Sequence, residues 1–214
     1  MACTLQLDRL GKRYRYEWIF KDLSTTIRAG ERLALLGPNG SGKSTLMKAL
    51  SGQLTPSKGQ LTYTVAGRSV GTDRIYRHLS YAAPYIELIE EFTLREAIDF
   101  HRRFKPLLNG LDTEAVIALL DFRRSQHKAV RNFSSGMKQR LKLALACCTD
   151  SALLLLDEPT TNLDEQGMRW YRGLIDRFGG GRTIVVASNV AVDYAFCDRR
   201  LSVLDHKPVR KRRR

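Results

Sequence analysis

The chain changes its hydrophobic pattern twice along its length. In residues 1–84, and again from about residue 150, short apolar or alternating runs bounded by turn residues predict β-strands. Between about residues 85 and 150 the apolar positions instead recur with helical spacing. The segments that we predict as strands are TLQLDRL (4–10), LSTTI (23–27), RLALLG (32–37), GQLTYTVAG (59–67), LSYAA (79–83), LLLLDE (153–158), TIVVAS (183–188) and RLSVLD (200–205).

The predicted helices carry start signals of their own. Thr93 with Glu96 three residues later forms a capping box at the head of TLREAIDFHRRF, and Asp112 or Thr113 stands in capping position at the head of DTEAVIALLDF. The other predicted helices are KSTLMKALSG (43–52), MKQRLKLALACC (137–148), EQGMRWYRGLIDRF (165–178) and VAVDYAFC (190–197). This alternation of strands and helices indicates an α/β fold with a mainly parallel, buried core sheet.

Length and composition agree with one folded unit. The 214 residues, 43% of them hydrophobic, suffice for a single core. We predict one domain over residues 1–214, with an α/β core of about 1–84 and 150–206 and a helical subdomain of about 85–149. We expect an antiparallel β edge beside the parallel sheet, because TLQLDRL and LSTTI alternate as half-exposed partners do.

The net charge of +14 draws attention to the C-terminal tail, residues 207–214, which carries six of the positive charges. Such a tail either contacts acidic lipid headgroups or RNA, or forms a solvated, disordered end. No apolar run approaches the ~18–20 residues that span a bilayer, and MACTLQLDRL lacks the apolar core of a signal peptide. We therefore predict a cytoplasmic location.

Neither the cysteines nor the histidines suggest a metal site. Cys3, Cys147, Cys148 and Cys197 form no C-x-x-C pair, and the four histidines are scattered along the chain. We predict reduced, partly buried thiols and assign no ligand role to a histidine.

Residues 37–45, GPNGSGKST, fit the phosphate-binding pattern G-x-x-x-x-G-K-[ST]. The pattern stands between a predicted strand and a predicted helix, as its mechanism requires. Backbone N–H groups of residues 39–45 would wrap the phosphates, Lys43 would reach the β/γ oxygens and Ser44 would hold Mg²⁺. The predicted phosphate-binding residues are Gly37, Pro38, Asn39, Gly40, Ser41, Gly42, Lys43, Ser44 and Thr45.

Two carboxylates end the apolar run LLLLDEP. Asp157 would bind Mg²⁺ through water, and Glu158 would lie beyond the γ-phosphate, where it can act as the general base for an attacking water. An apolar run followed by aspartate is a weak signal alone. Together with the glycine-rich loop and the continuation DEPTTNLD it becomes a strong one.

The stretch FSSGMKQR, residues 133–140, predicts a second anion-binding position. Its two hydroxyls and glycine stand at the head of a predicted helix, where free N–H groups and the positive end of the helix dipole favour an anion. Phe133 follows Lys43 by 90 residues, so this position is separate from the first loop. The alternative is that Ser134 only caps the helix.

In order and spacing these motifs resemble the nucleotide-binding domain of ABC ATPases, over nearly the whole chain. GPNGSGKST resembles the Walker A loop, FSSGMKQR the signature motif, LLLLDEP the Walker B strand and TNLD, residues 161–164, the D-loop. The resemblance implies an ATPase whose cofactors are ATP and Mg²⁺. It also implies a nucleotide-binding role for Asp164 and places Tyr14 against adenine, with Tyr16 and Trp18 as alternatives.

Two chains of this family associate head to tail, so that each signature motif closes on the ATP of the other chain. The resemblance therefore implies that Ser134, Ser135 and the Gly136 N–H contact the γ-phosphate in trans. The second ATPase chain would be an identical copy or a different one. The motif departs from the family's Leu-Ser-Gly-Gly-Gln at Phe133, Ser135 and Met137.

Two further departures concern hydrolysis. Where the family has a Mg²⁺-ligating glutamine, the stretch SYAAPYIEL has Ala83 or Pro84. Where the family has a histidine after the strand TIVVAS, this chain has Asn189, which can hydrogen-bond a phosphate but cannot take up a proton. We therefore expect slow hydrolysis, with Glu158, Lys43 and Asn189 as the catalytic residues. The alternative role for Asn189 is to cap the helix that follows.

The resemblance predicts an ATPase subunit that dimerises around MgATP and powers a separate membrane permease. The helical subdomain would be its docking face, and the subunit would lie in the cytoplasm, peripheral to the inner face of the membrane. The alternative is a soluble ABC ATPase that acts on a protein or nucleic-acid assembly, as in iron–sulfur cluster assembly or translation. We consider a nucleic-acid partner the weaker of these expectations.

Overall fold

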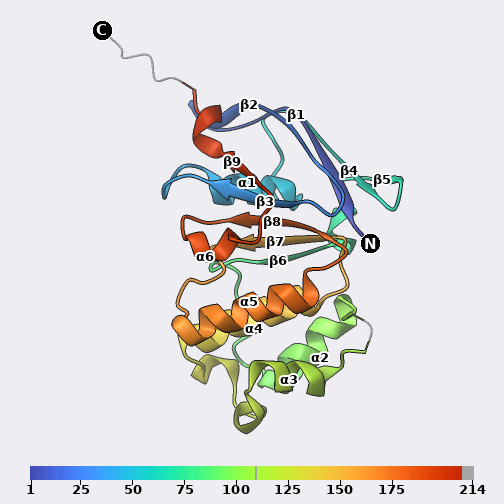
Figure 1. Ribbon diagram of the computed structural model, residues 1–214, viewed down its shortest axis with the longest axis vertical. Coiled ribbons are helices and arrows are strands. Elements are labelled where there is room, and N and C mark those ends of the chain that lie inside the picture. The colour runs from blue at the N-terminus through green and yellow to red at the C-terminus, as the bar shows by residue number, and fades with distance from the viewer. Residues whose placement is uncertain (109, 209–214) are drawn as a thin grey trace.

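The computed structural model describes residues 1–108 and 110–208, and these residues form three layers (Figure 1). An antiparallel sheet lies at one end, a parallel sheet lies in the middle, and a group of helices covers the far face of the parallel sheet. This arrangement confirms the predicted α/β fold with a parallel core sheet, an antiparallel edge and a helical part.

The antiparallel sheet has the strand order β2-β1-β4-β5. Leu5 of β1 lies opposite Ile27 of β2 on one side and opposite Tyr63 of β4 on the other, so the two segments that we paired from their alternation do pair. The short strand β5 was not predicted. The strands are β1 (Cys3–Tyr14), β2 (Glu17–Ile27), β4 (Lys58–Val65) and β5 (Arg68–Val70).

The second sheet is parallel in every pairing and has the order β6-β7-β8-β3-β9. Every residue of β7 and β8 is buried, as expected for strands covered on both faces. Parallel strands end at the same edge, so the loops after β3, β7 and β8 share that edge. The strands are β3 (Arg32–Leu36), β6 (Leu79–Ala82), β7 (Leu153–Asp157), β8 (Thr183–Ala187) and β9 (Arg199–Ser202).

The helices begin where the sequence signals place them. Thr93 and Glu96 make both hydrogen bonds of the capping box before α2, and Asp112, rather than Thr113, caps α3. The helices are α1 (Lys43–Leu50), α2 (Leu94–Phe104), α3 (Thr113–Leu120), α4 (Ser135–Cys148), α5 (Glu165–Phe178) and α6 (Ala191–Tyr194). Short 3₁₀ turns complete them: η1 (Ile75–Arg77), η2 (Arg123–Ser125), η3 (Val130–Asn132) and η4 (Val203–His206).

Two predicted elements end earlier than the sequence suggested. The strand expected over 200–205 stops at Ser202 and continues as η4, and the helix expected over 190–197 is the single turn α6. No helix among residues 1–108 and 110–208 has the length and apolar character that crossing a membrane would require.

Two hydrophobic cores flank the parallel sheet. One joins α1 and the antiparallel sheet to one face, with Leu46, Met47 and Phe20 fully buried. The other core joins helices α2, α3, α4 and α5 to the opposite face of the sheet, with Leu141, Leu154 and Tyr171 fully buried. Helices α1 and α4 therefore lie on opposite sides of the same sheet (Figure 1).

Candidate functional site

The residues that we predict to carry the chemistry lie at the edge where the carboxyl ends of β3, β7 and β8 meet. The glycine-rich loop of residues 37–42 follows β3, Asp157 and Glu158 lie at the end of β7, and Asn189 follows β8. Ligands of open parallel sheets bind beyond this edge of the strands. The topology therefore brings together residues that lie up to about 150 positions apart.

The loop holds its shape through backbone conformations that favour glycine. Gly37, Gly40 and Gly42 have φ angles of 148°, 75° and 107°. A Cβ on Gly37 would come within 2.5 Å of the Ser41 Oγ, and one on Gly42 within 2.5 Å of the Ile19 side chain of β2. The loop therefore packs closely against Ser41 of its own turn and against Ile19 of the antiparallel sheet.

Lys43 is buried at the centre of this loop. Its Nζ donates hydrogen bonds to the carbonyl oxygens of Gly37 at 2.6 Å and Pro38 at 3.3 Å, and to the Asn189 Oδ1 at 3.1 Å. Ser41 is buried as well, and its Oγ has no hydrogen-bond partner within the described chain. An ammonium in this position is the group that such a loop uses against phosphate oxygens.

Asn189 joins the end of β8 to the loop. Its Oδ1 accepts the hydrogen bond from Lys43, and its Nδ2 donates to the Asn39 Oδ1 at 2.8 Å. The capping alternative for Asn189 is wrong: α6 begins after Val190 without a side-chain cap, and the Val190 N–H donates to the Ser188 hydroxyl. The amide thus lies among the residues that we predict to bind phosphate.

Asp157 is buried and has one oxygen to spare. Its Oδ2 accepts a hydrogen bond from the Tyr85 hydroxyl at 2.9 Å, whereas Oδ1 has no partner in residues 1–108 or 110–208. Burial raises the pKa of Asp157, and the hydroxyls of Ser44 and Tyr85 act against that rise. A spare carboxylate oxygen beside a hydroxyl supplies the hard oxygen ligands that Mg²⁺ prefers, so Ser44 and Asp157 fit this ion.

Glu158 has a strained backbone. Its φ of 45° lies in the left-handed region, which is costly for a residue with a side chain. Its N–H donates to the Ala187 carbonyl at 2.8 Å, which ties the turn to β8. The half-buried side chain lines a cavity of about 240 Å³ together with Asn39, Thr160 and Asn189.

The head of α4 is a separate place in the molecule. Ser134 is its N-cap, and its Oγ accepts from the Met137 N–H at 3.2 Å, so the capping role is real. Ser134 and Ser135 are exposed, and α4 lies across the parallel sheet from α1. Among the described residues, no hydrogen bond therefore connects the signature stretch to the glycine-rich loop of the same chain.

One hydrogen bond and one close approach of the backbone link the head of α4 to the segment that follows β7. The Gln139 Nε2 donates to the Pro159 carbonyl at 2.8 Å, and a Cβ on Gly136 would lie 3.0 Å from the Asn162 carbonyl. Asp164, predicted to bind nucleotide, caps α5 by accepting from the Gly167 N–H at 2.7 Å. The signature and D-loop stretches are therefore neighbours within one chain.

The three aromatic candidates for adenine stacking lie at the tip of the β1–β2 hairpin. Tyr14 and Tyr16 are exposed, Tyr16 almost completely, while the Trp18 ring lies near the guanidinium of Arg13 and the ammonium of Lys21. The neighbouring Ile19 touches the loop at Gly42, so the hairpin borders the phosphate loop. The role of Tyr14 stays a prediction.

The cysteines and histidines lie outside this site. All four thiols are free, and Cys3, Cys147 and Cys148 are buried, as predicted. His101 is hydrogen-bonded to the Thr149 hydroxyl at 2.8 Å, and burial lowers its pKa to about 4. In the part of the chain that the structure describes, no three His, Cys, Asp or Glu side chains cluster as metal ligands.

Sequence reasoning missed Tyr85 and Gln139. Tyr85 follows directly on the positions where we noted the missing glutamine, so its place in the stretch SYAAPYIEL was the available signal. Gln139 had no signal beyond its position near the head of a predicted helix. The predicted tail, residues 207–214, lies outside the described residues from position 209 onward.

Comparison with known proteins gives consistent matches. A family model described as ABC transporter matches residues 20–161. The chain is 37% identical to the Nod factor export ATP-binding protein I of Rhizobium johnstonii, over 94% of its own length and 66% of the relative's. It is 39% identical to the protein of the same name from Rhizobium meliloti, over 94% of its own length and 62% of the relative's.

A solved structure supports the fold. The dimeric post-hydrolysis state of an ATP-binding cassette with bound ADP and phosphate matches with a TM-score of 0.79 at 21% identity. The match covers 92% of this chain and 93% of that one. The chain thus has the fold of that cassette, while it spans slightly less than two thirds of the length of the first of the curated relatives above.

Proposed function

The chain belongs to the ABC transporter family, and on this basis we propose that it is an ATP-binding subunit that dimerises around MgATP, hydrolyses it and powers a separate membrane permease. The observation that carries the proposal is the meeting of Lys43, Asp157, Glu158 and Asn189 at one edge of the parallel sheet. This constellation contains a phosphate-binding cation, a metal-binding carboxylate and a general base.

Nucleotide binding rests on the glycine-rich loop. Its N–H groups and the Lys43 ammonium would hold the β- and γ-phosphates of ATP, and the spare oxygen of Asp157 with the Ser44 hydroxyl would hold Mg²⁺. When bound, the ion supplies charge neutralisation between the phosphates. Tyr14 at the hairpin tip would stack on adenine, since the residue is 48% exposed, with the Lys12 ammonium 5.3 Å from its ring centroid.

Hydrolysis rests on Glu158. Its carboxylate would take a proton from a water as that water attacks the γ-phosphorus and the bond to the β-phosphate oxygen breaks. The Asn189 amide, held against Lys43, would donate a hydrogen bond to the phosphate but could not carry charge. We therefore expect turnover that is slow but measurable.

Dimerisation rests on the exposed head of α4. In a head-to-tail pair, Ser134, Ser135 and the Gly136 N–H of one chain would meet the γ-phosphate held by the other, with Asp164 of the adjoining D-loop beside them. The free N–H groups at this helix end suit an anion. The second chain would be an identical copy or a different ATPase.

The permease would dock on the helical side of the molecule. A groove of about 780 Å³ is lined by residues 84–91 together with Lys138 and Lys142, and three of its residues are glutamates. Next to it, the rings of Phe92, Phe100 and Phe104 contact one another in sequence, the first pair edge-on and the second tilted, and Phe104 is 69% exposed. Glu90 is ion-paired with Lys138, so Glu87 and Glu91 are the acidic side chains that the groove offers to a partner. A cytoplasmic permease segment with basic and apolar side chains would complement these two glutamates and the phenylalanines, and would keep the subunit at the inner face of the membrane.

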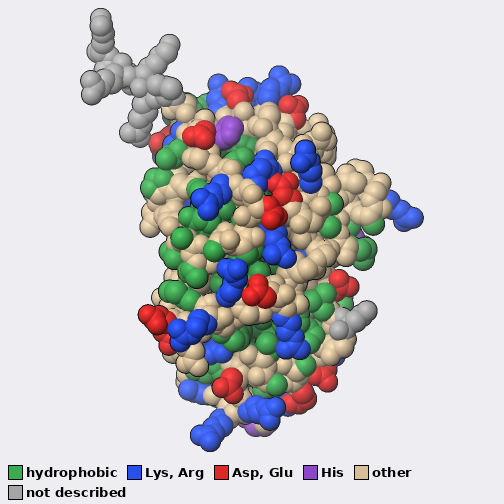
Figure 2. Space-filling view, in the orientation of Figure 1, with side chains coloured by type: hydrophobic (Ala, Val, Ile, Leu, Met, Phe, Trp, Pro, Cys, Tyr) green, Lys and Arg blue, Asp and Glu red, His purple; other side chains and the backbone are tan. Residues whose placement is uncertain are grey.

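The alternative is an ABC ATPase that acts on a protein or nucleic-acid assembly without a permease. Basic and acidic side chains are interspersed over the face that Figure 2 shows, so this face does not carry the basic patch that nucleic acid favours. The names of the relatives refer to export. Both observations favour transport, and a role of the tail at acidic lipids stays a proposal for residues outside the described part.

Two measurements test the proposal. Purified chain with MgATP should release phosphate, and Glu158→Gln should abolish that release while ATP still binds. In the native cell, the tagged chain should co-purify with a multi-span membrane protein in the membrane fraction. If the chain hydrolyses ATP but co-purifies with no membrane protein from the native cell, the alternative function is favoured. If it binds no ATP at all, both functions are contradicted.

A further inference from the structure

Tyr85 connects two parts of the molecule that are far apart in sequence. It lies three residues after the end of β6, and its hydroxyl donates to the Oδ2 of Asp157, 72 residues away, at 2.9 Å. The parallel register that sets Ala82 opposite Leu156 brings the two residues to the same edge of the sheet. The contact is therefore a product of the core topology.

The ring of Tyr85 is held on two sides. The Lys48 ammonium, in the last turn of α1, lies 4.3 Å from the ring centroid, and the Tyr81 ring stands edge-on at 6.3 Å. The two tyrosine hydroxyls are hydrogen-bonded to each other. Burial, with a contribution from Asp157, raises the pKa of Tyr85, so its hydroxyl keeps its proton at neutral pH.

On the other side of this contact, the hydroxyls of Ser44 and Tyr85 both stabilise the charged form of the Asp157 carboxylate. The carboxylate is buried with Oδ1 unpartnered among the described residues, and a buried carboxylate without hydrogen bonds is unfavourable. The bond from Tyr85 satisfies one oxygen and fixes the plane of the carboxylate. Oδ1 is thereby left for the metal side of the site.

We propose that Tyr85 is the positioning residue of the magnesium site, acting through its hydrogen bond to Asp157. The proposal rests on the proposed MgATP binding. Positions 83 and 84, directly before Tyr85, hold alanine and proline, whose side chains make no hydrogen bonds. In this segment Tyr85 therefore supplies the polar contact to Asp157. It orients a metal ligand and does not ligate the metal itself.

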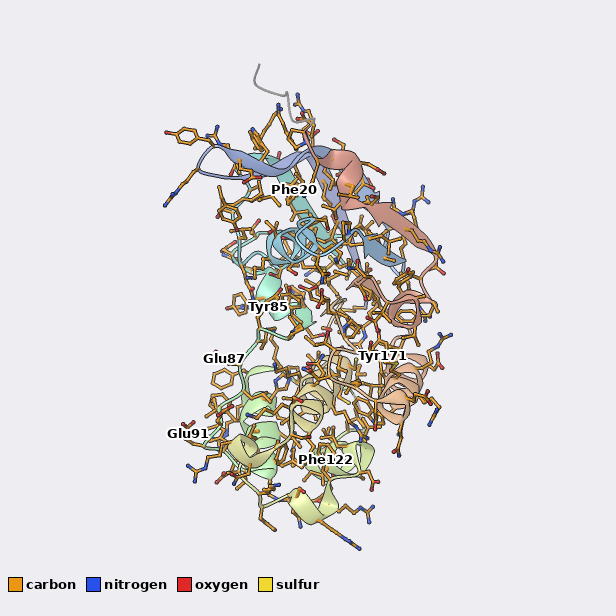
Figure 3. All side chains as sticks on the ribbon, turned by 90° about the vertical axis from the view of Figure 1, so that its left-hand side faces the viewer. Phe20, Tyr85, Glu87, Glu91, Phe122 and Tyr171 are labelled. Carbon is orange, nitrogen blue, oxygen red and sulfur yellow. The ribbon has the colours of Figure 1, made fainter. Side chains whose placement is uncertain are left out.

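Tyr85 is also part of the groove that we assign to the permease. Figure 3 shows it on the same side of the molecule as Glu87 and Glu91, which continue the groove toward the helices. Pro84, its neighbour, accepts a hydrogen bond from the Lys142 Nζ of α4 at 2.8 Å. The side chain that orients Asp157 therefore belongs to both the groove and the metal site.

The test is Tyr85→Phe, which removes the hydroxyl and keeps the ring on Lys48. ATP affinity is measured by calorimetry in EDTA and over a series of Mg²⁺ concentrations. We expect unchanged affinity in EDTA and a Mg²⁺ requirement that rises roughly 10- to 100-fold, the usual effect of losing a residue that orients a metal ligand. Tyr76→Phe, which removes an exposed hydroxyl away from Asp157, should leave both values unchanged.

A second variant separates the hydrogen bond from packing. Tyr81→Phe removes the partner of Tyr85 but leaves the bond to Asp157, so its effect on the Mg²⁺ requirement should be smaller. A Tyr85→Phe protein with wild-type Mg²⁺ dependence would overturn the proposal, as would equal losses in EDTA and in Mg²⁺, or a larger effect of Tyr81→Phe. If the wild-type chain itself bound no ATP, the proposed function would fail instead.

Discussion

The glycine-rich loop and the head of α4 are both predicted to bind phosphate, yet they are built in opposite ways. At the loop, Lys43 is 4% exposed and its ammonium is bonded to two carbonyls and to Asn189. At the head of α4, Ser134 and Ser135 are exposed, and the Ser134 Oγ accepts the capping hydrogen bond from the Met137 N–H. The first region is folded around its functional group, whereas the second presents its groups to solvent.

This difference shows what each region needs in order to work. The loop is held by the antiparallel sheet on one side and by β8 on the other, so we expect one chain to suffice for nucleotide binding. The head of α4 offers its N–H groups at an exposed surface, and a single helix end binds an anion weakly. A second chain would supply the missing wall, so the contrast predicts binding by one chain and hydrolysis by two.

The largest effect should follow from Lys43→Ala. Hydrogen bonds to charged groups contribute about 1.5–3 kcal/mol each. Losing two of them to phosphate oxygens should weaken ATP binding on the order of 10²- to 10⁴-fold. Calorimetry measures the affinity, with Lys58→Ala, at an exposed lysine paired with Asp22, as the control. Unchanged affinity would refute the assignment of the loop.

Glu158→Gln should separate binding from hydrolysis. Removing a general base typically lowers the rate roughly 10²- to 10⁴-fold, while the phosphate-binding groups remain. ATP should then persist between two chains, and gel filtration with MgATP should show a stable dimer. Glu165→Gln, at an exposed glutamate paired with Arg169, is the matched control. A protein that stays monomeric at high concentration would argue for a different partner chain or against the head-to-tail dimer.

Ser135→Glu tests the head of α4 without weakening the helix. The first turn of α4 has no acidic residue, and a carboxylate there interacts favourably with the helix dipole, which stabilises the helix by about 0.3–1 kcal/mol. Facing a bound γ-phosphate, the same carboxylate repels it, and like charges in contact cost several kcal/mol. Even about 2 kcal/mol would weaken ATP-dependent dimerisation roughly 30-fold. Ser135→Ala controls for loss of the hydroxyl.

Mixing two inactive variants sharpens this test. A pair formed from Lys43→Ala and Ser135→Glu chains has one site that carries both changes and one site that carries neither. If each site combines the loop of one chain with the α4 head of the other, the mixture should hydrolyse ATP although neither variant does so alone. If each chain completes its own site, mixing should restore nothing.

Much of this contrast could be predicted from the sequence. The loop was predictable because its function needs particular backbone conformations, and glycines at positions 37, 40 and 42 signal them. The helices α2 and α3 were predictable because their apolar spacing and their capping residues agree. The strand β5 was missed because its three residues are too short for a period, and α6 was overestimated because an apolar run can also pack as a single turn.

Tyr85 shows why the rest was not predictable. Its bond to Asp157 depends on the register between β6 and β7, which places side chains 72 residues apart in contact. Local periodicity carries no information on register between distant strands. The departure from the family pattern marked the right stretch of sequence, but only the structure identified the residue that occupies the site.

The smallest effect, and the only gain, should come from Asn189→His. The Asn189 amide already lies at the phosphate loop, bonded to Lys43 and Asn39, so it can donate a neutral hydrogen bond to a γ-phosphate. Losing one stabilising donor commonly costs about 10²- to 10³-fold in rate. Because asparagine recovers part of this, we expect the histidine variant to be only roughly tenfold faster.

The rate advantage of the histidine variant over wild type should grow as the pH falls through about 6.5, where an imidazole becomes a charged donor. The wild-type rate should lack that dependence. Asn189→Ala should be slower than wild type. If wild type already matches the histidine variant and Asn189→Ala keeps its rate, then Asn189 serves the shape of the loop and Glu158 suffices for hydrolysis.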